Sequence, residues 1–396
     1  MNKKITILAI ILIALILTAS AYATYNHFYL STSLPSSTPS PIATSSPTPS
    51  PIATPTPNPT PSPTPVPTSV NVVDGNGDNL TIALPVTSIV SITATTTEML
   101  CVMGLSSEIV GVDTSSITPP SLANVPVVTG PESDYEPNVE EIIQLNPSII
   151  FADSMLPYNT AAYQQLEAAG IPIYIVDTTV DLPVNPSNMT AAQLYQMPTV
   201  VDFTCDLMQN LVQIFPSQQP QVTAYVNWAQ SYNQLVKNRI AAMPISDEVS
   251  VFLDWYDYPY ETFVTQAVYQ AGGYNIAENQ TVYSPVLSPE FVVAQNPTAI
   301  ILMVDSPTHN INDFKAAIND VESYPELQNV TAIEDKNVYA CDFDARSGVL
   351  AVIGYLAWAK WLQPSLFPDI DPDTVLLQLN EQFLNSTMPG TFVYPD

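Results

Sequence analysis

The chain has 396 residues, of which 46 % are hydrophobic and 11 % charged, so it can form a sizeable core and exceeds the usual length of one domain. Lys and Arg together number 8 against 37 Asp and Glu, and the formal net charge of −29 argues against a nucleic acid partner. Two His argue against a His-rich metal site. Cys101, Cys205 and Cys341 lie far apart in the sequence, so we interpret them as free thiols in apolar surroundings.

The N-terminal segment has the pattern of an export signal. Lys3 and Lys4 precede an apolar run that extends from Ile5 to about Ala23. Small residues near its end fit a cleavage site, yet the run is nearly long enough to span a bilayer. No Cys follows this run directly, which excludes a lipid-modified N-terminal cysteine. Residues 1–30 are therefore expected to be a signal peptide or an N-terminal membrane anchor, with the rest of the chain outside the cytoplasm.

A segment of biased composition follows. The 39 residues from Ser31 to Ser69 include 13 Pro, 10 Ser and 9 Thr and no charge. Such a segment favours an extended spacer of about 120 Å, at ~3.1 Å per residue, and a spacer is useful only if its near end is held, which favours the anchor. We assign 31–85 to this tether and its lead-in. Glycosylation sequons, compatible with an exterior glycoprotein, begin at Asn79, Asn188, Asn279, Asn329 and Asn385.

From residue 86 onward, short β-branched runs alternate with helical patterns, which predicts parallel sheets with crossover helices. We assign 86–198 to an N-terminal lobe. Its expected strands are 88–93, 109–112, 125–128, 148–152 and 171–176, and its expected helices are 96–103, 139–145 and 160–169.

Two helical patterns at 200–215 and 221–242 predict a spine over residues 199–245. A stiff connector of this kind would let two lobes rock by small angles rather than close by a large hinge motion. We assign 246–396 to a C-terminal lobe. Its expected strands are 249–253, 299–304 and 338–343, and its expected helices are 263–271, 289–295, 349–361 and 374–383. The predicted fold class is α/β, with two Rossmann-like lobes joined by a long α-helix.

An internal repeat with an offset of 150 residues is the most informative feature. The sequence EEIIQLNPSII at 140–150 aligns with EFVVAQNPTAI at 290–300. In both copies a Glu opens a two-turn helix, Asn-Pro ends it, and an apolar strand follows. Helix capping alone explains either copy, because a carboxylate is favoured in a first turn. Two matching copies predict that the lobes present equivalent acidic edges to one partner.

Here the chain resembles the substrate-binding proteins of ABC importers for vitamin B12, ferric siderophores and haem, over residues 86–394. The repeat contributes to the match, together with five further pieces, each weak alone: IVSITATTTEML at 89–100, GL at 104–105, IVGVD at 109–113, PP at 119–120 and AGGYNI at 271–276. The resemblance implies two lobes with a rigid helical backbone and a ligand cleft between them. It also implies that Glu140 and Glu290 dock onto arginines of the permease, with Glu141 as the alternative to Glu140.

Aromatic residues mark the expected walls of the cleft. Trp255, Tyr256, Tyr258 and Tyr260 directly follow a predicted strand, at the strand end where open α/β sheets bind ligands. Tyr135 and Tyr283 precede the two repeat helices and are expected to line the same cleft. Core packing is the competing interpretation for any one of these aromatics. Their rings and hydroxyls are typical of a site for a large ring system or chelate. The six predicted ligand-binding aromatics are Tyr135, Trp255, Tyr256, Tyr258, Tyr260 and Tyr283.

Asp342 and Arg346 follow the strand at 338–343. The resemblance places both on positions that reach the corrinoid in B12-binding relatives, and an arginine fork suits a propionate, carboxamide, phosphate or catecholate oxygen. Structural pairing of Arg346 with nearby carboxylates is the alternative. The chain departs from B12-binding relatives at the ends of other strands of the first lobe. Residues 117–118 and 153–154 occupy positions there where aromatics are expected, and this leaves the identity of the cargo open.

Enzyme motifs are absent from the sequence: it has no GxSxG, GxxxxGK[ST] or GxGxxG. His309 is interpreted as a solvated loop residue rather than an axial metal ligand. Asp305, Asp342 and Asp344 lack the regular spacing of a cation site, so no metal site and no cofactor are predicted.

The sequence thus predicts an exported, membrane-anchored monomer that captures a metal-chelate nutrient for an ABC permease and its ATPase subunits. A corrinoid is the first choice of cargo, a ferric siderophore the second and haem the third. Two alternatives remain open at this point. One is a tethered adhesion or structural protein with the same fold, and the other is an enzyme that handles tetrapyrroles.

Overall fold

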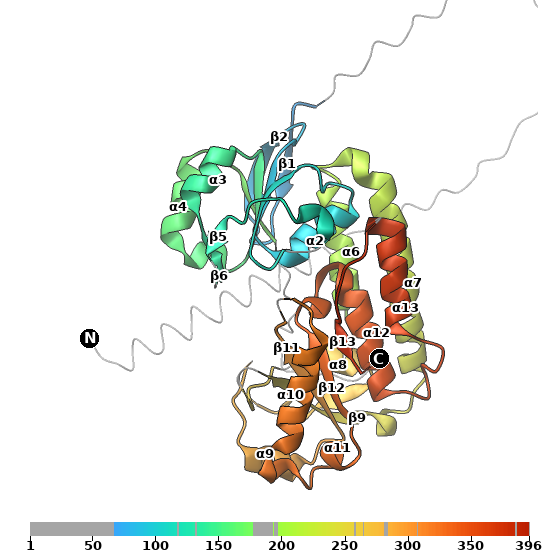
Figure 1. Ribbon diagram of the computed structural model, residues 1–396. Helices are drawn as coiled ribbons and strands as arrows, with labels where there is room; N and C mark the ends of the chain where they lie inside the picture. The colour runs from blue at the N-terminus through green and yellow to red at the C-terminus, as the bar shows by residue number, and fades with distance from the viewer. Residues whose placement is uncertain are drawn as a thin grey trace, which may run out of the picture. The chain divides into compact units, whose positions relative to one another are not determined.

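The computed structural model describes residues 67–116, 119–130, 133–176, 193, 197–256, 259–263, 265–280, 284–306, 308–384 and 386–395 (Figure 1). The export signal or anchor at 1–30 and the tether up to residue 66 lie outside this described part, as do Asn188 and Asn385 of the sequons. Among the helices of the described residues, none has both the length and the apolar character needed to cross a bilayer.

A β-hairpin precedes the expected N-terminal lobe. Strand β1, Ser69–Val73, pairs antiparallel with β2, Asn79–Ala83. Val72 and Ile82 are buried in the main core, and the turn is attached to the first sheet because the Gly75 N–H donates to the Ile175 carbonyl at 2.7 Å. The range that the sequence assigned to tether and lead-in therefore includes a folded hairpin. Its signal is weak, since each strand buries one side chain fully.

The first sheet is parallel and has the strand order β4-β3-β7-β8. Its strands are β3 Ile89–Ser91, β4 Ile109–Val112, β7 Ile149–Asp153 and β8 Ile173–Val176. Its helices are α2 Ala94–Val102, α3 Val139–Leu145 and α4 Thr160–Ala168. These agree with the predicted elements. The predicted strand at 125–128 is wrong: only an isolated bridge joins Val127 to Val112, and the chain continues into a small antiparallel pair of β5, Thr129–Gly130, and β6, Ser133–Pro137.

The second sheet has the order β10-β9-β11-β12-β13 and is parallel except for β13. Its strands are β9 Val249–Trp255, β10 Gly273–Asn275, β11 Ala299–Val304, β12 Val338–Asp342 and β13 Val393–Tyr394. Its helices are α8 Gln266–Gln270, α9 Pro289–Gln295, α10 Ile311–Ser323, α11 Thr331–Glu334, α12 Ala351–Leu362 and α13 Pro372–Leu379. Helix α10 was not predicted, although its buried Phe314, Ala317 and Val321 have helical spacing.

Both sheets share one topology. When the parallel strands of each sheet are numbered in chain order, their spatial order is 2-1-3-4 in both sheets. The second sheet has the antiparallel strand β13 as an additional edge strand. Strand β11 is buried on both faces, as is usual for parallel sheets. Ile301 and Met303 belong to the main core, whereas Ile300, Leu302 and Val304 pack into a second cluster that includes Phe314 of α10. The α/β fold with two similar lobes agrees with the prediction.

Helices α6, Val200–Leu211, and α7, Gln219–Ala241, form the predicted spine. The residues of α7 that are fully buried recur at spacings of three and four, and they are Val222, Tyr225, Ala229, Asn233, Val236 and Ile240. One continuous hydrophobic core includes Ile89 of the first sheet, Tyr225 of α7 and Leu253 of the second sheet. Helix α12 belongs to the same core, and all of its residues except Lys360 are buried. The spine is therefore packed into both lobes rather than acting as a free connector.

Candidate functional site

The carboxyl ends of the second sheet's strands form the candidate site. In the parallel register Met303 lies beside Trp255 and Val304 lies beside Asp342, so β9, β11 and β12 end at one edge of the sheet. Residues that follow these strands are brought together although they are far apart in the sequence. This is the edge at which open α/β sheets bind ligands.

An aromatic platform, defined as Trp255, Phe263 and Phe343, lies at this edge. The Trp255 ring is 5.4 Å from the Phe263 ring and 4.9 Å from the Phe343 ring, measured between centroids. Trp255 is half-buried, and its indole N–H is buried without a hydrogen-bond partner among the described residues. Sequence reasoning identified Trp255 but missed both Phe residues, because Phe263 was assigned to a helix and Phe343 to a strand.

Arg346 lies on the aromatic platform. Its guanidinium carbon is 4.4 Å from the centre of the Phe343 ring and 5.5 Å from that of Phe263, so it makes cation–π contacts with both. The side chain is half-buried, and within the described part of the chain it takes part in no ion pair. Within the described residues the structure therefore gives no support to the alternative that Arg346 is paired with a nearby carboxylate. A guanidinium at this position has the donors to bind an anionic or carbonyl group.

The other predicted aromatics are not all at the platform. Tyr256 is half-buried and packs against the second cluster of the C-terminal lobe. Tyr260, with a positive φ of 66°, stacks on Phe252 and donates its hydroxyl to Glu326 at 2.9 Å, so its ring belongs to the packing of its own lobe. Tyr258 and Tyr283 lie outside the described residues, and so does the side chain of Tyr135, whose backbone is in β6.

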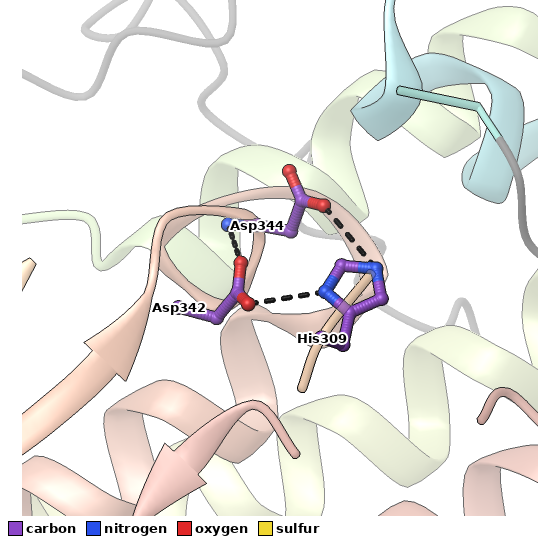
Figure 2. A group of neighbouring side chains, drawn as sticks. All are labelled: His309, Asp342 and Asp344. Atoms are coloured by element: carbon purple, nitrogen blue, oxygen red, sulfur yellow. Dashed lines mark hydrogen bonds and ion pairs between the residues drawn. The ribbon is translucent and has the colours of Figure 1, made fainter. Parts of the chain in front are cut away.

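His309, Asp342 and Asp344 form a cluster, called the His309 cluster below (Figure 2). Its two Asp residues are close to Arg346 in the sequence. His309 Nδ1 is 3.0 Å from Asp342 Oδ2, and Asp342 Oδ1 accepts the Asp344 N–H at 3.0 Å. His309 Nε2 faces Asp344 Oδ2 at 3.9 Å. The interpretation of His309 as a solvated residue is wrong, because its side chain is 3 % exposed. Sequence reasoning missed this because nothing local shows that a loop histidine is covered by Phe392 from another segment.

Burial and mutual charge set the protonation of this cluster. Burial raises the pKa of Asp342, more than its hydrogen bond to His309 lowers it. Burial, followed by the charge of Asp342, raises the pKa of Asp344 to about 7. Burial lowers the pKa of His309, but the hydrogen bond and charge of Asp342 outweigh it, so that this pKa is raised overall. The expected contact between Asp342 and a cargo gains no support, since its side chain is 2 % exposed and engaged with His309.

The carboxyl edge of the first sheet meets this site. Thr95, at the start of α2, has its hydroxyl 3.3 Å from that of Ser347. Gly348 has a φ of 63°, and a Cβ there would lie 2.5 Å from the Thr95 side chain. Asp113 follows β4, accepts the N–H groups of Ser115 and Ser116, and contributes to the raised pKa of Asp344. The two lobes thus bring their carboxyl edges together at these residues.

The two repeat helices match in detail. Asn138 caps α3 by accepting the Glu141 N–H, and Ser288 caps α9 by accepting the Phe291 N–H. Both helices end at an Asn in the left-handed region, Asn146 with φ 47° and Asn296 with φ 48°. The next strands begin alike, because the Ser148 N–H donates to the Ser88 carbonyl at 2.8 Å and the Thr298 N–H donates to the Ser250 carbonyl at 3.0 Å. The repeat is therefore structural as well as sequential.

Glu140 and Glu290 occupy the same position in these helices and are exposed. Glu141 is half-buried, and its carboxylate accepts a hydrogen bond from the Asn138 side chain at 3.0 Å. Glu140 is thus the repeat partner of Glu290, and Glu141 is the residue that contacts the cap. Docking by this pair stays a prediction.

A family model described as periplasmic binding protein matches residues 89–345. The chain belongs to the periplasmic binding protein family. This binding protein is accordingly a substrate-binding protein of an ABC transporter, which implies permease and ATPase partners and work outside the cytoplasm, and it is not an enzyme. That agrees with the resemblance found in the sequence.

Individual comparisons agree with this assignment. This binding protein is 24 % identical over 309 residues to an uncharacterised ABC transporter substrate-binding lipoprotein, YvrC of Bacillus subtilis, and the match covers 76 % of this chain and 87 % of the relative. The first Cys after its apolar N-terminal run is Cys101, so no Cys of the kind that a lipoprotein carries follows the run directly.

Solved structures show the same fold. The molybdate-binding protein MolA of Haemophilus influenzae, bound to molybdate, has a TM-score of 0.62 at 17 % identity, with 81 % of this chain and 99 % of that chain covered. The haem-binding protein RhuT from Roseiflexus sp. RS-1 has a TM-score of 0.53 at 18 % identity, covering 70 % of this chain and 98 % of that chain. At such identities the likeness establishes the fold and leaves the ligand undetermined.

Proposed function

We propose that this binding protein captures a metal-chelate nutrient, a corrinoid or a ferric siderophore, at the facing carboxyl edges of its two sheets. The observation that favours such a cargo is Arg346 on the aromatic platform. Flat aromatic surface binds the apolar face of a large ring or chelate, and a guanidinium that has no ion pair among the described residues provides donors for its peripheral oxygens. Haem is the third candidate, and a haem-binding protein with this fold is among the structural neighbours.

Delivery to the permease is proposed to use Glu140 and Glu290. Each lobe presents one exposed carboxylate at the same position of a matching helix. Two separated carboxylates that meet arginine pockets would fix orientation as well as affinity. The N-terminal segment is proposed to anchor the protein, with the Pro-rich tether as spacer, and family membership favours this transport role over the adhesive alternative.

Intrinsic fluorescence titration tests the cargo. Trp255 lies in the aromatic platform, so a bound corrinoid or ferric chelate should quench its emission. Cobalamin, cobinamide, a ferric catecholate, a ferric hydroxamate and haem are titrated into the full chain, and Trp255→Phe identifies the part of the quenching that comes from this residue. Saturable quenching by one of them at micromolar or lower concentration supports the proposal. If none of the five quenches while a glycan panel yields binding, the adhesive alternative replaces it.

A further inference from the structure

The His309 ring is held in one position from several sides. The His309 N–H donates to the Ser306 carbonyl, and the Thr391 N–H donates to the His309 carbonyl, each at 2.8 Å. The ring lies 4.5 Å from that of Phe392, and Gly390 packs so closely that a Cβ there would be 2.3 Å from the His309 Cβ. The residue also has a positive φ of 49°, which few non-glycine residues adopt. A side chain fixed in this way is preorganised rather than loosely placed.

Its contacts assign the tautomer of the neutral ring. Asp342 is buried and already accepts one backbone N–H, so as a carboxylate it accepts a second hydrogen bond from His309 Nδ1. The proton is therefore on Nδ1, and the lone pair is on Nε2. A carboxylate that receives the Nδ1 proton of a histidine is the usual support of a metal-binding imidazole, because it orients the ring and raises its basicity.

The other ring nitrogen lacks a partner. Nε2 is buried and has no hydrogen bond within the described part of the chain. The Asp344 oxygen that faces it is 3.9 Å away, which is too far for a hydrogen bond. Two ligand atoms at about 2.0 to 2.2 Å from a shared ion lie roughly 3.4 Å apart at a tetrahedral angle, so these two donors would need to approach each other by about 0.5 Å to share one metal. Figure 2 shows the Asp344 carboxylate facing Nε2, while Asp342 lies beside Nδ1.

We propose that His309 Nε2 and the Asp344 carboxylate bind a first-row divalent transition metal such as Zn²⁺ or Ni²⁺, with Asp342 holding the ring. A mixed nitrogen and oxygen donor pair suits these ions, whereas Mg²⁺ and Ca²⁺ prefer oxygen ligands alone. The Asp344 side chain is 24 % exposed, which gives an ion access from its side. Two protein ligands leave coordination positions for water or for donor atoms of a small chelator. The proposal does not rest on the cargo proposed above, because the test uses the ion alone.

Charge favours the same conclusion. The carboxylates of Asp113 and Asp305 act on Asp344 together with that of Asp342, so the cluster is rich in negative charge. A divalent cation between Nε2 and Asp344 would neutralise part of it. The rival arrangement is an imidazolium between two carboxylates, which needs no metal.

Isothermal titration calorimetry on the full chain at pH 7.5 separates these arrangements. Zn²⁺ and Ni²⁺ are titrated alone, with Mg²⁺ and Ca²⁺ for comparison. One equivalent of Zn²⁺ or Ni²⁺ should bind, and His309→Gln and Asp344→Asn should each weaken binding at least tenfold. Asp342→Asn should weaken it about 10- to 100-fold, as for other residues that support a ligand. Asp305→Asn, which removes a nearby charge but no donor, and His27→Gln, which removes the only other His, should bind within about twofold of the unchanged protein.

Either of two results overturns the proposal: no Zn²⁺ or Ni²⁺ binding by the unchanged protein, or binding that Asp344→Asn leaves intact. Because His309→Gln removes a buried ring, circular dichroism must show that this variant is folded. If it is not folded, Asp344→Asn decides the test, since the Asp344 side chain is only half-buried. Nitrogen-15 NMR of the His309 ring gives a second readout. A doubly protonated ring at pH 7.5 that does not change when Zn²⁺ is added establishes the imidazolium instead.

Discussion

Arg346 and Asp342 are four residues apart and follow the same strand, yet their surroundings differ. Arg346 rests on two rings of the aromatic platform and has no ion pair within the described residues. Asp342 is buried and hydrogen-bonded to His309. Of the two residues that the resemblance assigned to the cargo, Arg346 is therefore the one that we propose to bind it.

Replacing Arg346 should therefore affect binding more than stability. Arg346→Ala should weaken binding of the quenching chelate at least tenfold. The affinity of Arg346→Lys should lie between those of Arg346→Ala and the unchanged protein, because a Lys keeps the charge but loses the planar fork. Fluorescence titration and thermal unfolding measure the two effects. The control is Lys336→Ala, which removes an exposed cation paired with Glu322. An unchanged dissociation constant with a lowered Tm would assign Arg346 to structure.

A second residue-scale prediction concerns pH. Asp254 is buried in β9 and accepts the Tyr260 N–H at 2.9 Å, and burial raises its pKa well above the ordinary value of 3.8. The folded state then holds this proton more tightly than the unfolded state, so its contribution makes the free energy of unfolding fall as pH rises above about 4. Asp254→Asn is neutral at every pH and retains an acceptor. Its Tm relative to the unchanged protein should therefore be higher at pH 8 than at pH 4.

Asp202 provides a control of opposite sign. Burial raises its pKa, but the hydrogen bond from Lys237 at 2.6 Å and further donors outweigh burial, so the pKa is lowered. Its contribution to stability is present above the ordinary value near 3.8 and is lost as pH falls through the folded-state value. Asp202→Asn should cost more at pH 8 than at pH 3. Parallel pH profiles for the two variants would contradict at least one of the two assignments.

At the scale of elements, α3 and α9 show what local sequence can specify. Their caps, their lengths and their left-handed Asn ends follow from residues within a dozen positions, and the sequence predicted both helices with the bounds that the structure has. The strand expected at 125–128 failed because its pairing depends on a partner elsewhere in the sheet, and Val112 offers it only a bridge.

The two helix ends should respond differently to mutation. Asn146 and Asn296 share a left-handed backbone, so Ala at either position should cost about 1 kcal/mol. Asn296 also bonds Thr331 twice through its side chain, accepting the backbone N–H at 2.9 Å and donating to the hydroxyl at 3.0 Å. Asn146→Gly should therefore be nearly neutral, whereas Asn296→Gly should destabilise by roughly a further 1 kcal/mol. Urea unfolding compares the four variants; equal effects of the two Gly changes would rule out a role for the Thr331 contacts.

At the scale of the whole molecule, one hydrophobic core passes from the first sheet through α6, α7 and α12 to the second sheet. The Tyr225 hydroxyl of α7 donates to the Val349 carbonyl and the Thr204 hydroxyl of α6 donates to the Gly348 carbonyl, so the spine is bonded to the segment that joins the site to α12. A shared core of this kind favours small relative motions of the lobes. It also keeps the helices that present Glu140 and Glu290 on one scaffold.

The docking prediction belongs to this scale. Glu140→Ala combined with Glu290→Ala should leave cargo affinity within about twofold, because the aromatic platform is untouched, while uptake through the permease should fall at least tenfold. Each single variant should show an intermediate loss of uptake. Glu167→Ala with Glu334→Ala, which removes one exposed carboxylate from another helix of each lobe, is the matched control. Equal loss of cargo binding and uptake would contradict separate docking and cargo sites.

The amino-acid sequence by itself determined the α/β alternation, the spine, the repeat at 140–150 and 290–300, and through these the family. Such features are local periodicities, caps and matched segments, which residues close in the chain specify. Tertiary structure decided which strand ends meet: it joined Phe263 and Phe343 to Trp255, placed Arg346 on Phe343, and buried His309 against Asp342 and Asp344. These contacts depend on sheet register and on segments that cover the site, several of them far away in the sequence, and no local pattern encodes them.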